Sequence, residues 1–194
     1  MKIPIYQVDA FANERFKGNP AAVCPLDSWL PDAVMQNIAA ENNLAETAFI
    51  VPAGNEYEIR WFTPTVEVDL CGHATLASAY VLFNELGFAG DQINFISHRS
   101  GPLSVTTNGS VLALNFPVDS LTELPLKPAF AIGLSKAPVK VFKGKTDYLF
   151  VYDSEAEILA LQPDFEALKA HDVRGIIVTA PGEKTDFVSR FFGP

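Results

Sequence analysis

Apolar and polar residues alternate in several short runs of this chain, and a period of two residues is typical of a half-buried β-strand. Residues 3–11 follow this pattern, and strands are also predicted over residues 21–24 and 57–62. Between them, residues 31–40 begin with Pro-Asp, which favours the start of a helix because proline fits the first helical position. The first part of the chain is therefore predicted to form strands with one helix inserted.

Residues 73–86 show a different pattern, because apolar side chains cover nearly every face of the helix they would form. These side chains are Ala74, Leu76, Ala77, Ala79, Val81, Leu82, Phe83 and Leu86. A helix that is apolar all round is normally buried on all sides, and Gly87 is expected to end it. The sequence thus predicts a central helix sheathed by β-strands.

The start of this helix, Cys71-Gly72-His73, is a candidate anion site. The first turn of a helix has backbone N–H groups without intrahelical partners and carries a partial positive charge. Gly72 has no side chain, so a ligand can approach that backbone closely. A carboxylate would fit there, whereas the preceding Glu67 and Asp69 are expected to serve loop structure.

After the central helix, strands are predicted over residues 93–97, 102–107 and 111–116, with Asn108-Gly109 as a hairpin turn. Three short segments of the first part then recur in the same order, 126 to 132 residues later. The pairs are Phe16-Lys17-Gly18 with Phe142-Lys143-Gly144, Leu30-Pro31-Asp32 with Gln162-Pro163-Asp164, and Arg60-Trp61-Phe62-Thr63-Pro64 with Arg190-Phe191-Phe192-Gly193-Pro194. Such self-similarity indicates two copies of one structural plan.

We therefore predict a first lobe over residues 1–118, which contains the central helix, and a second lobe over residues 119–194. The stretch 117–128 is the expected crossover between the copies. In the first copy the central helix follows Pro64, whereas the second copy stops at Pro194. The second lobe is thus expected to end before its own central helix.

Composition narrows the function classes. A hydrophobic content of 48% and a charged content of 19% over 194 residues are typical of a globular protein with a substantial core. The formal net charge of −9, with only 14 lysines and arginines, argues against nucleic-acid binding. No apolar run approaches the roughly 18 residues of a membrane span, so we expect a cytoplasmic protein without a membrane partner.

The cysteines and histidines do not indicate a metal centre. They are Cys24, Cys71, His73, His98 and His171, and Cys71 with His73 lacks a second pair at zinc spacing. Reduced thiols are expected, because the chain begins without a secretory signal. No metal and no cofactor are predicted.

Four motifs carry a resemblance that spans the whole chain. They are Val8-Asp9-Ala10-Phe11, Gly18-Asn19-Pro20-Ala21, Leu44-Ala45-Glu46-Thr47-Ala48-Phe49, and Phe62-Thr63-Pro64-Thr65-Val66-Glu67-Val68-Asp69-Leu70-Cys71-Gly72-His73-Ala74-Thr75. Together they resemble the PhzF-like isomerase family of phenazine biosynthesis, within the diaminopimelate epimerase superfamily. The resemblance implies an α/β (α+β) fold of two pseudo-symmetric lobes, each with strands wrapped around a central helix.

The resemblance also implies site residues. The catalytic acid/base of the family falls on Glu46, and the pair that contacts the substrate falls on Gly72 and His73. A second acidic residue and a Gly-Ser helix start come, in the family, from a segment just after the position matching Pro194, so this chain is expected to lack them. A homodimer is a further expectation from the family.

Each of these residues also has a purely structural interpretation. Glu46 could cap or solvate a helix–strand junction, and His73 could bond a neighbouring backbone group. Asn19 could simply make a turn with Gly18, since both residue types suit turns, although the superfamily places an asparagine from this loop near the substrate.

Three functions stay open from the sequence. The leading hypothesis is a cofactor-independent isomerase of a small carboxylate-bearing metabolite, with Glu46 as acid/base. The second is a thiol-dependent epimerase or racemase, because Cys71-Gly72 resembles the Cys-Gly-Asn element of such enzymes, with His73 in place of the asparagine, and a helix N-terminus favours the thiolate. The third is a non-catalytic protein that binds small acids.

Overall fold

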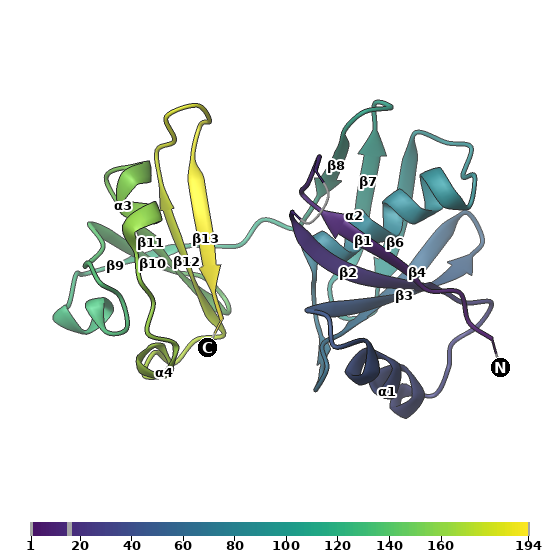
Figure 1. Ribbon diagram of the computed structural model, residues 1–194, viewed down its shortest axis with the longest axis horizontal. Coiled ribbons are helices and arrows are strands. Elements are labelled where there is room, and N and C mark those ends of the chain that lie inside the picture. Colours follow the sequence, from purple (N-terminus) through teal and green to yellow (C-terminus); the bar gives the residue numbers. More distant parts are fainter. Residues whose placement is uncertain (1, 15–16, 194) are drawn as a thin grey trace. The chain divides into compact units, whose positions relative to one another are not determined.

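The computed structural model describes residues 2–14 and 17–193 of the chain. The fold separates into two compact units, Met1–Pro117 and Val118–Pro194, each with its own hydrophobic core. Figure 1 shows α2, the central helix, inside the first unit. In the part of the chain that is described, no helix is long and apolar enough to cross a membrane.

The first unit is built on one eight-stranded sheet. Its strands are β1 (Tyr6–Ala10), β2 (Asn19–Pro25), β3 (Glu46–Ala53), β4 (Glu56–Phe62), β5 (Glu67–Val68), β6 (Gln92–Ser97), β7 (Gly101–Thr107) and β8 (Leu112–Asn115). They lie in the order β1-β2-β3-β4-β6-β7-β8, with β5 paired to β4. The β2–β3 and β4–β6 pairs are parallel and the others antiparallel.

Helix α2 (Gly72–Tyr80) lies inside the curl of this sheet. It packs against β1, β2 and β3 at one end of the strand order and against β8 at the other end. Ala74, Ala77 and Ala79 are almost completely buried, because small side chains let the backbone of the helix approach the surrounding strands. The prediction of a helix sheathed by strands is confirmed.

The helix differs in detail from the expected span 73–86. It begins at Gly72, and after Tyr80 the backbone widens into a π-helical turn over Val81–Glu85. Gly87 follows with φ +70°, and the N–H of Phe88 donates to the carbonyl of Leu82 at 2.9 Å. Gly87 therefore ends the helix in the left-handed conformation, as expected.

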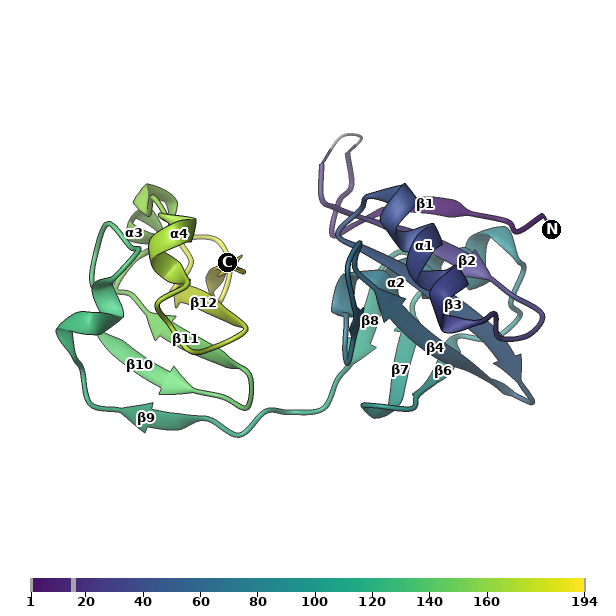
Figure 2. The ribbon, with the colours of Figure 1, turned by 90° about the horizontal axis from the view of Figure 1, so that it is seen from below.

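Helix α1 (Asp32–Asn42) covers the opposite face of the sheet, below β3 and β4 in Figure 1. Met35 and Ala39 of this helix belong to a second core that includes Cys24, Phe49 and Phe62. Strand β3 is thus buried on both faces. Figure 2 shows α1 from the side on which it covers the strands.

The second unit repeats this topology. Its elements are β9 (Thr122–Leu124), a 3₁₀ turn (Pro128–Ala131), β10 (Lys140–Lys143), β11 (Asp147–Val151), α3 (Glu155–Ala160), α4 (Phe165–Leu168), β12 (Gly175–Ala180) and β13 (Val188–Phe192). The pairs β10–β11, β11–β12 and β12–β13 are antiparallel, parallel and antiparallel, which is the succession of β1 to β4. The sequence repeat is therefore a repeat of structure.

Several details of the prediction need correction or lie outside the description. The expected strand 3–11 is shorter, and Asn19 and Pro20 begin β2 rather than closing a turn. Strand β9 occupies part of the expected crossover 117–128. Phe16 and Pro194, which belong to the repeat, lie outside the described residues.

Candidate functional site

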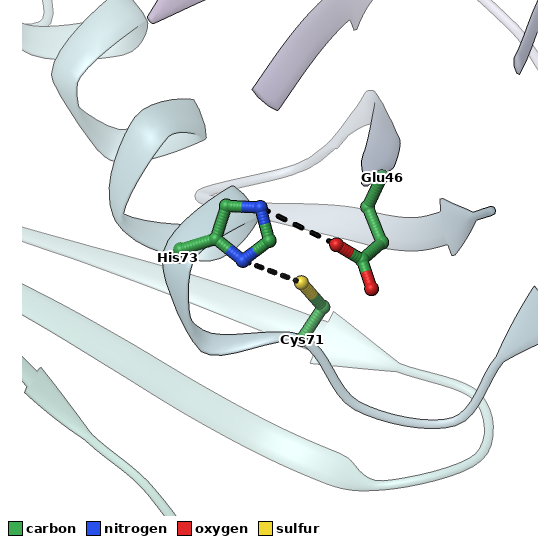
Figure 3. A group of neighbouring side chains, drawn as sticks. All are labelled: Glu46, Cys71 and His73. Atoms are coloured by element: carbon green, nitrogen blue, oxygen red, sulfur yellow. Dashed lines mark hydrogen bonds and ion pairs between the residues drawn. The ribbon is translucent and has the colours of Figure 1, made fainter. Parts of the chain in front are cut away.

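Three side chains meet at the head of α2 (Figure 3). Glu46 is the first residue of β3, Cys71 immediately precedes α2, and His73 is its second residue. The Nε2 atom of His73 lies 3.3 Å from Oε2 of Glu46, and its Nδ1 atom lies 3.4 Å from Sγ of Cys71. The imidazole ring thus stands between a carboxylate and a thiol.

The sheet and the helix explain why these residues converge. Strands β2 and β3 are parallel, so their first residues lie at the same end of the sheet, where Glu46 pairs with Ala21. This end of the two strands lies near the start of α2, as the contact between Glu46 and His73 shows. His73 is in the first turn of a helix that the same strands enclose. Residues 25 positions apart in sequence, Glu46 and Cys71, are therefore brought together by the curl of the sheet.

Burial controls the charge of His73. Its side chain is only 9% exposed, and desolvation lowers the pKa of the imidazole below its ordinary value of 6.5. The Glu46 carboxylate and the backbone of Pro20 act in the opposite direction, but they do not overcome the desolvation. His73 is therefore a neutral imidazole at pH 7.

The Nε2 atom of His73 is poorly satisfied. Its distance to Glu46 is that of an ion pair, but the geometry is not that of a hydrogen bond. Within the described residues no hydrogen bond of this buried Nε2 atom meets ordinary geometric criteria, although the backbone of Pro20 lies near enough to the ring to act on its pKa. Such atoms are rare in native proteins and often mark functional positions.

The start of α2 is suited to an anion. Cys71 has extended backbone angles, φ −143° and ψ 113°, and its side chain does not cap the helix by a hydrogen bond. The first turn carries no acidic residue. Backbone N–H groups and the partial positive charge of the helix are thus not neutralised by a residue of that turn.

The structure gives a second reason for a glycine at position 72. A Cβ atom at this position would lie 3.2 Å from Cε2 of Phe116, so the missing side chain makes room for an aromatic ring that follows β8. From the sequence, Gly72 is explained only by the close approach of a ligand. In this structure the close packing of the Phe116 ring also favours a small residue there.

Asn19 lies two residues before Ala21, which pairs with Glu46, but it is not one of the three residues that meet at the start of α2, Glu46, Cys71 and His73, called the trio below. It is the half-buried first residue of β2 and pairs with Ala10. Its neighbour Pro20 contributes the backbone group that acts on His73. Gly18 precedes it with φ +85°, and an added Cβ would lie 2.3 Å from the carbonyl oxygen of Ala10, so this turn requires glycine.

Glu46, Cys71 and His73 together form a group of side chains that could bind a metal ion. One ligand atom from each of Glu46, Cys71 and His73 can be chosen so that all three lie within 4.8 Å of one another. The sequence did not indicate this cluster, because ligand spacing along the chain cannot include a residue from another strand. Cys24, by contrast, is fully buried beneath α1, and desolvation raises its pKa to about 12.

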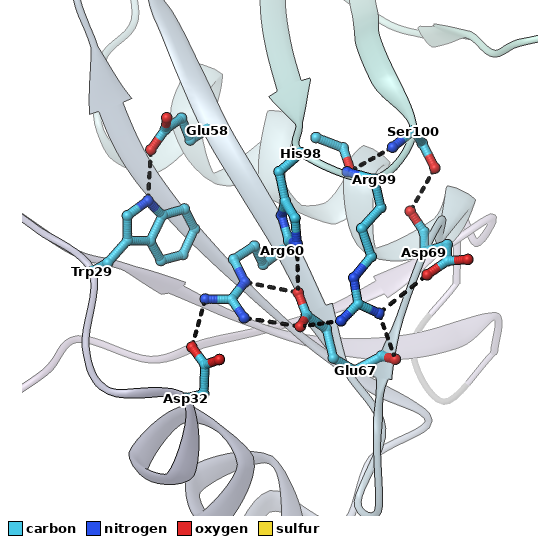
Figure 4. A network of polar contacts seen from close by, with 10 residues as sticks. Trp29, Asp32, Glu58, Arg60, Glu67, Asp69, His98, Arg99 and Ser100 are labelled. Carbon is cyan, nitrogen blue, oxygen red and sulfur yellow. Dashed lines mark hydrogen bonds and ion pairs between the residues drawn. The ribbon is translucent and has the colours of Figure 1, made fainter.

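A second polar cluster, centred on Arg60 of β4, was not predicted from the sequence (Figure 4). The Arg60 guanidinium donates to both carboxylate oxygens of Glu67, at 2.7 and 2.8 Å, and to Asp32 at 2.9 Å. Arg99 donates to Glu67 at 2.7 Å and to Asp69 at 3.1 Å. These contacts agree with the structural interpretation of Glu67 and Asp69.

The largest effect on the ionisation of Glu67 is the hydrogen bond from Arg60, which holds its pKa below the ordinary value of 4.5. An arginine between the apolar residues Ile59 and Trp61 of β4 was the available signal for this cluster. A pocket of about 370 Å³ lies beside it, lined by Trp29, Asp32, Glu58, Ile59, Arg60, Ile96 and His98. The trio at α2 is not among its lining residues.

Comparisons with known proteins identify the relatives of this chain. Residues 8–194 match the family model described as phenazine biosynthesis-like protein. An uncharacterized isomerase of Pseudomonas aeruginosa is 52% identical over 194 residues, which are 100% of this chain and 74% of that protein. A phenazine biosynthesis-like domain-containing protein of Homo sapiens is 35% identical over 229 aligned positions, covering 100% of this chain and 76% of that protein.

A solved structure gives the same result. The crystal structure of a phenazine biosynthesis protein of the PhzF family from Enterococcus faecalis has 51% sequence identity and a TM-score of 0.92, and the match covers 100% of this chain and 74% of that one. A predicted epimerase from Pseudomonas aeruginosa, at 21% identity and a TM-score of 0.64, shares the fold over 91% of this chain and 70% of its own. The diaminopimelate epimerase-like fold that the motifs implied is therefore confirmed.

These relatives are longer than this chain, which covers 70% to 76% of their length. The match nevertheless extends over both units, with the four motifs of the resemblance among the residues it includes. The chain therefore belongs to the phenazine biosynthesis-like protein family, to which the PhzF proteins also belong.

Proposed function

We propose that the protein is a cofactor-independent isomerase that moves a proton within a small carboxylate-bearing metabolite, with Glu46 as the acid/base. The observation that carries the proposal is the contact of 3.3 Å between Glu46 and a neutral, buried His73. Proteins named isomerases among the relatives support the reaction class.

Glu46 has the environment that a proton carrier needs. Its side chain is 20% exposed, so the carboxylate is reachable from outside while the residues around it are buried. General acid–base catalysis requires the group to lie within hydrogen-bond reach of the proton it transfers. We propose that Glu46 takes a proton from a carbon of the substrate and returns it to another.

The start of α2 would hold the substrate. The protein has a net charge of −9, so an anionic substrate needs a local positive site, and the uncapped first turn of α2 offers one through the backbone at Gly72 and His73. The neutral imidazole of His73 would add a hydrogen bond without competing for the proton. We propose Asn19 and Cys71 as further residues beside the substrate.

The proposal is tested by turnover of a panel of small carboxylic acids that have a C–H bond next to the carboxylate or to a conjugated double bond. For an accepted substrate, Glu46→Gln should lower kcat by about 10²- to 10⁴-fold, which is the usual contribution of a general acid–base group. Glu41→Gln, an exposed acid on α1, is the matched control and should keep full activity. Unchanged kcat in Glu46→Gln would remove Glu46 from the reaction.

A second candidate is a thiol-dependent epimerase or racemase, and the contact of Cys71 Sγ with His73 at 3.4 Å favours it. An imidazole beside a thiol can accept its proton and so generate the nucleophilic or basic thiolate. Cys71→Ala distinguishes the two: it should abolish a thiol-dependent reaction and leave the Glu46 reaction within a few-fold.

A non-catalytic acid-binding protein is the remaining alternative. An acid from the panel that raises the melting temperature, yet is never turned over, would support it. Homodimerisation and a cytoplasmic location stay predictions from the family and the sequence.

A further inference from the structure

We propose that Glu46, Cys71 and His73 bind a divalent cation of the zinc class, and that this cation inhibits the protein by occupying the acid/base residue. The binding follows from the geometry alone, whereas the inhibition rests on the function proposed above. The three residues supply a carboxylate, a thiolate and an imidazole, which are the ligand types that zinc prefers.

The distances suit such an ion. Around a tetrahedral zinc, ligand atoms lie roughly 3.3 to 3.6 Å apart, given Zn–S and Zn–N bonds near 2.3 and 2.0 Å. The structure has 3.3 Å between His73 Nε2 and Glu46 Oε2 and 3.4 Å between His73 Nδ1 and Cys71 Sγ. Only one ring nitrogen can coordinate at a time, so only one of these two distances joins two ligands of the same ion. One ligand atom from each residue can be chosen so that all three lie within 4.8 Å of one another, and rotation of the side chains would bring them to the shorter spacing.

The unsatisfied imidazole nitrogen is an independent indication of a ligand. The side chain of His73 is more than nine-tenths buried, and its Nε2 points toward Glu46 without forming a hydrogen bond among the described residues. A metal ion between Nε2 and the carboxylate would satisfy both.

Three protein ligands leave one coordination position open, as in catalytic zinc sites. Binding removes the proton of the Cys71 thiol, which passes to solvent, and no change of oxidation state is involved. Once coordinated, the Glu46 carboxylate is no longer available to accept a proton from a substrate. Magnesium, which prefers oxygen ligands, should not compete.

The test is a titration of the full chain with Co²⁺, after treatment with a chelator and in the presence of a phosphine reductant. Cobalt bound to a thiolate gives a charge-transfer absorption in the near-ultraviolet and d–d bands in the visible. We expect one saturable site per chain, loss of the bands on adding Zn²⁺, and no effect of Mg²⁺. No saturable spectrum at millimolar Co²⁺ would overturn the proposal.

Two pairs of variants locate the ion. Cys71→Ala should abolish the charge-transfer band, whereas Cys24→Ala, which removes the other thiol from beneath α1, should keep it. If Cys71→Ala does not fold by circular dichroism, Glu46→Gln answers the same question: we expect at least about a 10-fold loss of affinity, against no change in Glu41→Gln. Bands that persist in Cys71→Ala, or affinity unchanged in Glu46→Gln, would contradict the site.

The optical signal is independent of activity. A protein that binds cobalt through Cys71 but turns over none of the acids would keep the metal site and refute the proposed isomerase. A protein that turns over an acid but shows no thiolate charge-transfer band would keep the proposed isomerase and refute the metal site. With both present, Zn²⁺ should inhibit turnover over the same concentration range in which it displaces cobalt.

Discussion

His73 shows how one residue can link packing to chemistry. The strands that enclose α2 also bury its imidazole, so the ring is neutral and can accept or donate a hydrogen bond beside Glu46. A charged imidazole in the same place would form a stronger ion pair with the Glu46 carboxylate. That ion pair would hold the carboxylate in its ionised form. The low exposure of His73 therefore disfavours a permanent salt bridge with Glu46.

The lowered pKa of His73 predicts a dependence of stability on pH. In the unfolded chain this histidine binds a proton below its ordinary pKa of 6.5, whereas in the folded protein it stays neutral to a lower pH. The unfolded state then holds more protons, so the free energy of unfolding should decrease as the pH falls from 6.5, by at most about 1.4 kcal/mol per pH unit.

This effect is measured by urea unfolding at several pH values between 7 and 5, in wild type and in His73→Asn. The variant should show a smaller decrease of the free energy of unfolding over this interval. An equal decrease in both proteins would show that His73 does not carry the effect.

At the scale of elements, the sheet curls because both of its ends pack on one helix. Helix α2 contacts β1 and β8, the first and last strands of the order, through alanines that allow close approach. In the middle of the strand order a polar cluster joins three elements, because Arg60 of β4 bridges Glu67 of β5 and Asp32 of α1. Glu67 therefore joins the strand that leads into the start of α2 to the rest of the sheet.

Glu67→Gln tests this role. Its side chain is 10% exposed, and the loss of charged hydrogen bonds to Arg60 and Arg99 should lower the free energy of unfolding by about 1.5 to 3 kcal/mol at pH 7. Because the pKa of Glu67 is lowered in the folded state, its contribution is fully present above pH 4.5 and is lost as the pH falls through the folded pKa.

The difference between wild type and Glu67→Gln should thus shrink in acid, as followed by chemical unfolding at pH 7 and at pH 3. Asp69→Asn is the matched control, since its side chain is 71% exposed, and should cost below about 1 kcal/mol. A Glu67→Gln protein as stable as wild type at pH 7 would contradict the role assigned to the cluster.

At the scale of the whole molecule, two units with separate cores follow one another along the chain. The segment that joins them is open to solvent, and Val118 is 96% exposed. We propose that the units correspond to two lobes and that a protease of broad specificity cuts first between residues 116 and 121. Mass spectrometry of early fragments checks this, and first cuts within either sheet would contradict it.

Much of the fold could be predicted from the sequence because local patterns carry it. Three local features were sufficient for this: the apolar surface of residues 73–86, the Asn108-Gly109 turn and the repeated segments. The structure confirms the helix, the hairpin and the repeat that they predict. The π-helical turn at Val81–Glu85 was not predictable, because its backbone responds to packing with distant strands.

For the candidate site, the motifs named Glu46, Cys71 and His73 separately but not their contacts. The distance between Glu46 and His73 depends on how β3 and α2 are placed by the curled sheet, which no local pattern reports. The packing of Phe116 against Gly72 and the bridge through Arg60 were missed for the same reason.

The proposed isomerase depends most on Glu46 as the group that moves the proton. The most direct measurement is the rate at which deuterium from heavy water enters an accepted substrate, followed by proton NMR, in wild type and in Glu46→Gln. We predict incorporation at a carbon-bound position by wild type and a rate at least about 10²-fold lower in the variant. Equal rates of incorporation in the two proteins would contradict the proposed function.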